Sequence, residues 1–508
     1  MPRGKEIRWV LFFLLVFFLM NLLFLTRYPL VHSDESWLAG LTRNIMESGS
    51  LSVTEPFFDL KPRYPHAIKI LFHLLQMPFL VIFGYSAFSV RLLSLIASCF
   101  ALYLVFRCCR VIATFRLSFA IMALVSLNGQ FLAAAHTARQ EILLLCSLFL
   151  LILLLLKSRG SLNTRRTALM GAVTGISVGL HPNSFLLSVG CGLAILFLML
   201  SQRKFQIKPL LAYISVTGMI ALLFIGLSFL FDSQFPAHYL AYGESEFDLI
   251  VPVSNKFREF FYYLEKLWYG VSGTYILPEL KANLVLFSLL LLFAAVKAFR
   301  TKEASIVSLI GMILGVLLGT ILIGRYNQLS AVLWMLPCYL LLAPLLFNKP
   351  WRKAAVCTLA IIFAVSSVIS VKPSLAFSYE DYLNQIGTYV SPGEKTLGNL
   401  SGGFYFDNGA LLDLRNLSYL KESSLSFAEY VKIRNIQVIL WPEEMDFIYS
   451  RRPAWNMVYG NPRYVGEAEE FLRTRCTYLG EFENRAYAVR IVQEIGKPYA
   501  IKAYRVNP

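Results

Sequence analysis

Long apolar stretches that recur through the first 371 residues limit what this chain can fold into. A transmembrane helix needs about 20 consecutive, mostly apolar residues, and the sequence offers one such stretch after another up to Val371. Apolar residues make up 57% of the 508 residues and charged residues only 15%. This is far more apolar sequence than a soluble core of that size needs. The pattern predicts an α-helical protein that crosses a membrane many times.

Eleven segments have the length and composition of membrane spans. They lie at roughly 8–30, 88–106, 117–135, 139–156, 168–181, 183–200, 209–231, 282–299, 304–323, 328–347 and 354–371. Arg3, Lys5 and Arg8 precede the first segment, and residues 26–29 after it do not form a small-residue cleavage site. We therefore expect an uncleaved anchor whose N-terminus lies in the cytoplasm.

The apolar segment 67–84 decides which side of the membrane each loop occupies. Lys69, His73, Gln76 and Pro78 interrupt it. If the segment lies along the membrane surface, all the strongly basic loops fall on the cytoplasmic side; if it crosses, they fall outside, against the positive-inside rule. These loops are centred on residues 107–116, 157–166, 203–208, 297–302 and 349–353. We therefore expect a long external loop, roughly 31–87, that holds two interfacial helices.

The net charge of +16 does not indicate nucleic-acid binding. The basic residues are spread through short loops and form no contiguous patch, so topology, with anionic lipid as a secondary contact, explains them better. The eight cysteines show no metal-ligand spacing and no disulfide framework.

After Val371 the composition changes, and we expect two domains: a transmembrane domain at 1–371 and an external soluble domain at 372–508. Short β-like runs alternate with helical stretches in this tail, which favours a small α/β layer fold. The expected strands lie at 395–400, 437–441, 477–482 and 486–492, and the expected helices at 379–390, 427–434 and 467–475. The tail has no phosphate loop or nucleophile motif, so we expect it to assist acceptor binding or stability.

Asp34 and Glu35 stand directly after the first predicted span, where an amphipathic helix over residues 36–46 would begin. Two adjacent carboxylates at a membrane exit are either a solvated flank or a working site. A helix lying along the bilayer surface would hold them at the interface rather than release them to water. A carboxylate in that position is a candidate base for deprotonating a hydroxyl group.

Further polar residues fall on the same predicted face of the membrane, where ionisable groups are costly and point to function. They are Asp59, Lys61, Arg63 and His66 in the first external loop, His136, Arg139 and Glu141 between the third and fourth spans, His181 at a hairpin apex, and Arg325 with Tyr326 between the ninth and tenth spans. Cations beside carboxylates suit a reaction in which a hydroxyl loses its proton while a lipid phosphate departs. The alternatives stay open: Arg139 and Arg325 could simply snorkel to head groups, and His181 could belong to a capped turn.

Several short motifs, taken in order, resemble the GT-C membrane glycosyltransferases. They are Asp34-Glu35-Ser36, the run from Lys61 to Lys69, Arg91-Leu92, the run from His136 to Glu141, residues 175–180, and Gly324-Arg325-Tyr326. The closest branch is that of protein O-mannosyltransferases and lipid A aminoarabinose transferases. The resemblance covers roughly residues 8–370 and does not extend to the tail.

The resemblance implies roles for individual residues. Asp34 would serve the acceptor with Glu35 in support, and Arg139, Arg325 and Tyr326 would contact the donor phosphate. One departure concerns a His-Pro-Pro or Lys-Pro-Pro triplet that is usual in the family, since this chain has Lys-Pro-Arg-Tyr-Pro-His at 61–66. Asp59, Lys61 and His66 therefore compete for that place, with Lys61 the candidate for phosphate.

The function expected from these observations is that of an inverting glycosyltransferase in the plasma membrane. It would move a sugar from a polyprenyl-phosphate monosaccharide to a hydroxyl of an envelope glycan, lipid or protein at the outer face. Involvement of Mg²⁺ or Mn²⁺ stays open, with Asp34 and Glu35 as the ligands if a metal takes part.

Two rivals differ in what the sequence should show. A lipid or solute transporter, or a flippase, would also carry buried charge, but internal repeats and acidic residues in mid-span would be expected. An oligosaccharide transferase to Asn shares the broad fold, but the tail lacks a Trp-Trp-Asp motif.

Overall fold

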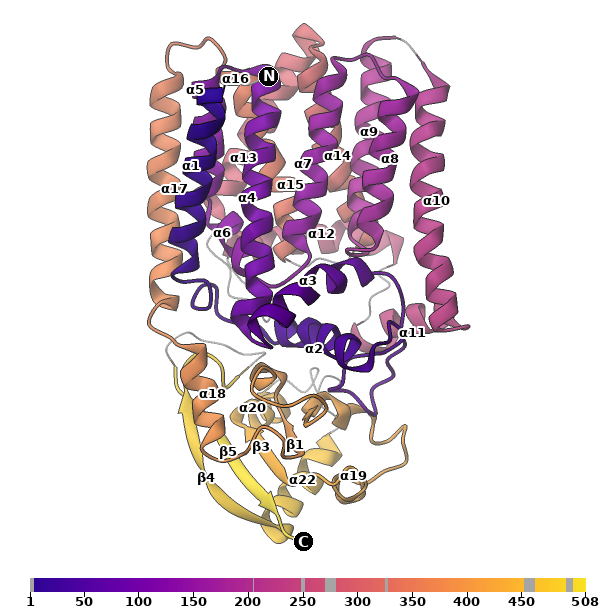
Figure 1. Cartoon of the computed structure of the whole chain (residues 1–508), viewed down its shortest axis with the longest axis vertical. Helices are drawn as coiled ribbons and strands as arrows, with labels where there is room; N and C mark the ends of the chain where they lie inside the picture. Colours follow the sequence, from indigo (N-terminus) through magenta and orange to yellow (C-terminus); the bar gives the residue numbers. More distant parts are fainter. Residues whose placement is uncertain are drawn as a thin grey trace.

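The computed structural model describes residues 4–203, 205–247, 252–269, 280–324, 328–451, 462–489 and 497–508. A bundle of helices forms the larger part of the molecule, and a smaller part with a β-sheet lies against one end of it (Figure 1). The N-terminus lies at the opposite end of the bundle, whereas the C-terminus lies in the part with the sheet. This arrangement confirms the predicted fold class, a helical membrane protein followed by a small α/β domain.

Each of the eleven predicted spans contains at least one helix. The bundle helices are α1 (Gly4–Leu22), α4 (Ala87–Ile112), α5 (Phe115–Ser126), α6 (Gly129–His136), α7 (Glu141–Ser158), α8 (Thr164–Val178), α9 (Ser184–Ser201), α10 (Ile207–Phe231), α13 (Lys281–Thr301), α14 (Ala304–Ile323), α15 (Val332–Met335), α16 (Leu342–Leu346) and α17 (Arg352–Ser374). Among the described residues, seven helices are long and apolar enough to cross a membrane, or eight if α5 and α6 form one span. The other predicted spans correspond to shorter helices or, in α1, to a helix with charges in its first turns.

The predicted span at 117–135 is broken rather than continuous. Helices α5 and α6 meet at an angle of 66°, and Asn128 stands at the break. Its side-chain oxygen accepts hydrogen bonds from the backbone N–H groups of Gln130 and Phe131, and its amide donates to Asn283 Oδ1 at 2.8 Å. An Asn side chain that caps a new helix in this way competes with the continuation of the preceding one.

Two helices of the first loop lie across the end of the bundle instead of running alongside it (Figure 1). They are α2 (Ser33–Ser48) and α3 (Ile70–Phe83), so segment 67–84 takes the crosswise position that the charge argument predicts. Helix α2 begins with a reciprocal cap: His32 Nδ1 accepts from the Asp34 N–H at 3.1 Å, and the Glu35 carboxylate accepts from the His32 N–H at 2.9 Å. The cap starts the helix at the acidic pair.

Two more helices belong to the loop after α10, namely α11 (Phe235–Phe247) and α12 (Lys256–Tyr269).

The C-terminal part contains a five-stranded sheet of order β2-β1-β3-β5-β4. Strand β1 pairs parallel to β2 and β3, whereas β5 is antiparallel to β3 and β4. The strands are β1 (Thr396–Gly398), β2 (Leu411–Asp413), β3 (Val438–Pro442), β4 (Cys476–Asn484) and β5 (Tyr499–Val506), and the helices are α18 (Tyr379–Gly387), α19 (Phe427–Ile433), α20 (Glu443–Arg451) and α22 (Pro462–Arg475).

Three of the four strands predicted in this part are present, and the fourth is wrong. Residues 486–489 form no strand, and 490–492 lie outside the described residues. The strand that pairs with both β3 and β4 is instead β5, near the end of the chain. Periodicity also misses β2, because three residues are too short to show an alternation.

The C-terminal part is docked on α2 and on the loop that follows it. Phe57 O accepts hydrogen bonds from the Asp413 N–H and from Asn416 Nδ2, both at 3.0 Å, and Arg43 Nη1 donates to Phe406 O at 2.9 Å. Apolar side chains from both sides share one buried cluster. Residues more than 300 positions apart in the sequence thus meet where the C-terminal part contacts α2 and the loop after it.

Candidate active site

Asp34 lies in the first turn of α2 and keeps 27% of its side chain exposed. Its carboxylate forms an ion pair with Arg139, which lies in the turn between α6 and α7. The Arg139 guanidinium also contacts Glu141 Oε1 at 3.2 Å. One planar cation therefore bridges two carboxylates at the start of two helices, where the helix dipoles stabilise negative charge.

Glu35 points inward, and its side chain is completely buried. Its two oxygens accept from Arg91 Nη2 and Nε at 2.6 and 2.7 Å, from the His32 N–H at 2.9 Å and from the Ala138 N–H at 2.8 Å. Arg91 is equally buried, and its Nη1 donates to the Leu25 and Pro29 carbonyls. The Glu35–Arg91 ion pair therefore links the residues after α1, the start of α2, α4 and the turn before α7. Glu35 is thus enclosed by protein, whereas Asp34 is partly exposed.

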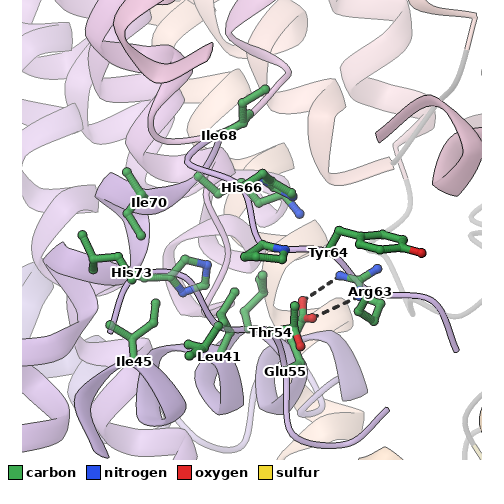
Figure 2. Close-up of a pocket in the computed structure, with 15 residues that line it drawn as sticks. Leu41, Ile45, Thr54, Glu55, Arg63, Tyr64, His66, Ile68, Ile70 and His73 are labelled. Carbon is green, nitrogen blue, oxygen red and sulfur yellow. Dashed lines mark hydrogen bonds and ion pairs between the residues drawn. The ribbon is translucent and has the colours of Figure 1, made fainter. Parts of the chain in front are cut away.

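A small pocket, with a cavity volume of about 20 Å³, lies between α2 and α3 and is partly open to solvent. Its α2 side is formed by Leu38, Leu41 and Ile45, and with Asp34 these recur at the helical spacing that places residues on one face. Figure 2 shows Leu41 and Ile45 on one side, Ile70 and His73 on the other, and an ion pair at one edge. The pocket therefore runs along the helix face that begins at Asp34.

The polar edge of the pocket combines a carboxylate with several cations. Glu55 and Arg63 form an ion pair at 2.7 Å (Figure 2), and burial opposes while Arg63 favours the charged carboxylate, so the pKa of Glu55 falls to about 2. His66 lies beside them with its ring 5.3 Å from that of Tyr239 in α11. Burial and then the charge of Lys69 lower the pKa of His66 to about 3, so this imidazole is neutral at physiological pH.

Lys69 also lines the pocket, and no site role was expected for it. Its backbone is left-handed, with φ of 94°, directly before α3. Burial first, and then the charge of Arg63, lower the pKa of Lys69 to about 8, while Glu55 and Asp34 act in the opposite direction. Within the described ranges no ion pair joins Lys69 to a carboxylate. The only sequence signal was its place as the last cation before an apolar helix.

Two predicted residues of the first loop lie where that loop meets the C-terminal part. The Lys61 ammonium lies 4.8 Å from the Trp37 ring centroid and 4.7 Å from that of Phe58. Asp59 accepts a hydrogen bond from the Tyr430 hydroxyl at 2.9 Å and pairs with Arg434 at 2.6 Å. Asp59 therefore holds the first loop to the C-terminal part.

The two remaining predicted histidines differ in position. His136 is fully buried in the bundle, with Nδ1 2.8 Å from Leu132 O and its ring against Phe24. His181 occupies the turn between α8 and α9, and its Nδ1 accepts from the Asn183 N–H at 3.0 Å. The same turn lies beside α3, because Gly179 O accepts a hydrogen bond from the Leu71 N–H at 2.8 Å. Arg325 and Tyr326 lie outside the described residues.

The sequence did not decide whether the protein binds a metal ion. In the parts of the chain that the structure describes, no group of three His, Cys, Asp or Glu side chains is arranged to hold a metal ion. The Glu35 oxygens are occupied by four donors, so Glu35 does not share a ligand set with Asp34.

The crosswise helices at the end of a bundle, followed by a domain docked on them, define the class of fold: this is the GT-C fold of membrane glycosyltransferases. No protein-family model and no curated protein sequence matches the chain. The likeness lies in solved structures at low sequence identity, and it shows the fold.

Two proteins illustrate this likeness. The archaeal oligosaccharyltransferase AglB from Archaeoglobus fulgidus, in complex with an inhibitory peptide and a dolichol-phosphate, has a TM-score of 0.56 and 11% identity over 95% of this chain and 74% of that chain. ArnT from Cupriavidus metallidurans, bound to undecaprenyl phosphate, has a TM-score of 0.50 and 13% identity over 99% of this chain and 98% of that chain. The crystal structure of an Archaeoglobus fulgidus oligosaccharyltransferase in complex with zinc and sulfate has a TM-score of 0.51 and 14% identity over 92% of this chain and 71% of that chain.

Proposed function

We propose that this protein is an inverting glycosyltransferase that moves a sugar from a polyprenyl-phosphate monosaccharide to an acceptor hydroxyl at the outer face of the plasma membrane. The observation that carries the proposal is the ion pair of a partly exposed Asp34 with Arg139, beside a pocket that contains Lys69, on a GT-C fold. Dolichol-phosphate in the AglB structure and undecaprenyl phosphate in the ArnT structure are both polyprenyl phosphates, which supports a donor of this class.

The reaction needs a base for the acceptor and positive charge for the departing phosphate. Asp34 takes the proton of the acceptor hydroxyl while that oxygen bonds to the anomeric carbon and the bond from this carbon to the phosphate oxygen breaks. The phosphate leaves with the electron pair, and Arg139 and Lys69 stabilise its charge. A single displacement of this kind inverts the anomeric configuration.

Glu35 is assigned a positioning role in this proposal, because it holds the start of α2 through Arg91 and does not face the pocket. Lys61, Arg325 and Tyr326 stay candidates for the donor phosphate, and Asp59, His66, His136, Glu141 and His181 stay site candidates. Participation of Mg²⁺ or Mn²⁺ is decided by measuring transfer with and without EDTA.

The proposed orientation puts the N-terminus in the cytoplasm and the C-terminal domain, residues 372–508, outside. Support comes from the opposite placement of the two termini in Figure 1 and from the positive-inside rule applied to the bundle 1–371. The site then faces the side where nucleotide sugars are absent, which fits a lipid-linked donor.

The test is Asp34→Asn, assayed by single-turnover transfer from polyprenyl-phosphate sugars to envelope fractions, beside donor binding in the same preparation. We expect donor binding to persist and transfer to fall by roughly 10²- to 10⁴-fold, because a general base acts mainly in the transition state. Asp381→Asn is the matched control, since Asp381 also lies in the first turn of a helix, α18, and is exposed.

Wild-type transfer by Asp34→Asn would contradict the assignment of the base. Loss of donor binding together with transfer would move Asp34 to the donor side. A wild-type protein that carries sugar-lipids across vesicle membranes but transfers no sugar would favour the transporter or flippase alternative.

A further inference from the structure

The seam between α2 and the C-terminal part contains an aromatic pair surrounded by cations. The rings of Trp37 and Phe58 lie 5.1 Å apart in an edge-to-face arrangement. The Arg415 guanidinium lies 4.5 Å from the Trp37 centroid and 4.7 Å from that of Phe58. Lys61 and Arg63 approach the same Trp37 ring at 4.8 and 5.0 Å. Cations from two distant parts of the sequence therefore converge on one place.

Arg415 reaches this place from the carboxyl end of a parallel strand. It stands two residues after β2, which is parallel to β1, and β1 is parallel to β3. Ligands of sheets with parallel strands generally bind outside the carboxyl ends of those strands. Asp413 holds Arg415 in position, because Asp413 Oδ1 accepts from Arg415 Nε at 2.7 Å and from the Arg415 N–H at 2.9 Å.

Two hydrogen-bond donors at the seam lack acceptors. Trp37 Nε1 and Arg415 Nη2 are buried, and neither has a hydrogen-bond partner among the residues that the structure describes. Only 4% of Arg415 is exposed. Buried donors without partners are uncommon in folded proteins, and each calls for an explanation. Indole and guanidinium groups donate and cannot accept, so a group that binds them here supplies acceptor atoms.

We propose that this seam binds an oxyanion, a phosphate or carboxylate group, carried by the acceptor saccharide. Trp37 Nε1 and Arg415 Nη2 donate to its oxygens. Trp37 follows Asp34 by three residues, a rise of about 4.5 Å along the helix. An acceptor held at the seam thus extends its hydroxyl towards Asp34. The inference rests on the proposed function for the identity of the ligand as the acceptor, but the binding site itself is testable without transfer.

The experiment measures binding of four probes to the purified full-length protein in detergent by calorimetry: glucose 1-phosphate, glucuronate, neutral glucose and inorganic phosphate. The variants are Arg415→Gln and Trp37→Phe, of which the second removes the indole N–H together with the rest of the five-membered ring and keeps one aromatic ring for the cations. Arg434→Gln is the control, because Arg434 docks the same domain through Asp59 and does not contact Trp37 in any ion pair or ring contact described above. Thermal unfolding of each variant checks folding.

We expect the charged sugars to bind at least about 10-fold more tightly than glucose, and Arg415→Gln to weaken them by roughly 10- to 100-fold. Trp37→Phe should weaken them by a smaller factor, and Arg434→Gln should leave them unchanged. Equal binding of charged and neutral sugars, or charged-sugar binding that neither variant alters, would overturn the site. Inorganic phosphate binding as tightly as glucose 1-phosphate would overturn the assignment of a saccharide.

The two proposals fail separately. If the protein binds glucose 1-phosphate through Arg415 but transfers no sugar, the proposed oxyanion site stands and the proposed transferase function is wrong. If the protein transfers sugar equally well to neutral and charged acceptors, and Arg415→Gln has full activity, the proposed transferase function stands and the proposed oxyanion site is wrong.

Discussion

Asp34 and Glu35 are neighbours in sequence with opposite surroundings, because successive residues of a helix point about 100° apart. Asp34 lies at the start of the α2 face that carries Leu38 and Leu41, and these two leucines line the pocket. Glu35 faces the bundle and meets Arg91. A carboxylate is thus a candidate base at position 34 and half of a buried ion pair at position 35. Substitution of Asp34 should therefore lower the rate of transfer, whereas substitution of Glu35 should lower the stability of the fold.

Glu35→Gln is expected to lower the stability of the fold more than it lowers the rate of sugar transfer by the folded protein. Removing one partner of a buried ion pair leaves the other charge uncompensated and costs about 3–5 kcal/mol, and both Glu35 and Arg91 are fully buried. The midpoint of thermal unfolding in detergent measures this. Glu259→Gln is the control, because Glu259 pairs with Arg258 on the surface of α12 and exposed pairs contribute about 0–1 kcal/mol. Equal midpoints for the two variants would contradict the assigned role of Glu35.

Lys69 predicts a pH dependence of donor binding. The phosphodiester of the donor keeps one negative charge across neutral and alkaline pH, so Lys69 is the group that titrates, and burial lowers its pKa to about 8. The ammonium form binds phosphate and the neutral amine does not. Donor affinity should therefore be nearly full at about pH 7 and below and fall as the pH rises through 8 to about 9.5, with some upward shift because bound phosphate favours the charged form.

Lys69→Arg is the matched variant for that experiment, since a guanidinium stays charged throughout this range. Titrating donor affinity from pH 6.5 to 9.5 should show a decline in the wild-type protein and a flat profile in Lys69→Arg. The same decline in both would assign the titration to another group.

At the scale of elements, two helix pairs pack closely through glycines at every fourth position. Gly311 and Gly315 of α14 face α9, where a Cβ added at Gly315 would lie 2.6 Å from Gly190 Cα and 2.7 Å from Val189 O. Gly171 and Gly175 of α8 face α10 in the same manner. Small residues at such spacing let helix backbones approach, which is the main source of helix association inside a membrane.

Gly315→Ala is therefore expected to destabilise the protein, because the atoms that a methyl group would meet belong to the backbone of α9 and cannot rotate away. Overpacking of this kind costs about 1–3 kcal/mol. Gly218→Ala on α10 is the control: its added Cβ would have no neighbour within 4 Å, and alanine favours a helix by about 1 kcal/mol over glycine. Thermal unfolding should move in opposite directions for the two variants, and a loss of stability in both would refute the packing argument.

At the scale of the whole molecule, the orientation in the membrane is the prediction on which the outer-face site depends. Ser161, in the turn between α7 and α8, and Glu422, in the C-terminal part, are exposed and belong to opposite ends of the molecule (Figure 1). Single cysteines are placed at these positions after Cys99, Cys357 and Cys476, the native cysteines that are at least partly exposed, are changed to serine.

An impermeant maleimide added to intact cells should label Glu422→Cys at once and Ser161→Cys only after permeabilisation. The reverse pattern would place the basic loops outside and remove the basis for an outer-face site. Labelling of both positions in intact cells would show that the cells leak, which a cytoplasmic marker protein detects.

Local sequence determined much of this protein. Apolar length defined the membrane class, loop charge required segment 67–84 to lie crosswise, and the acidic pair marked the start of α2, because each of these depends on residues close in sequence. Tertiary structure decided the rest. It paired Asp34 with Arg139, separated Glu35 from it, and brought Lys69 to the pocket and Arg415 to Trp37. Such contacts join residues far apart along the chain, and the geometry of packed helices and a docked domain, which no local pattern contains, determines which of them meet.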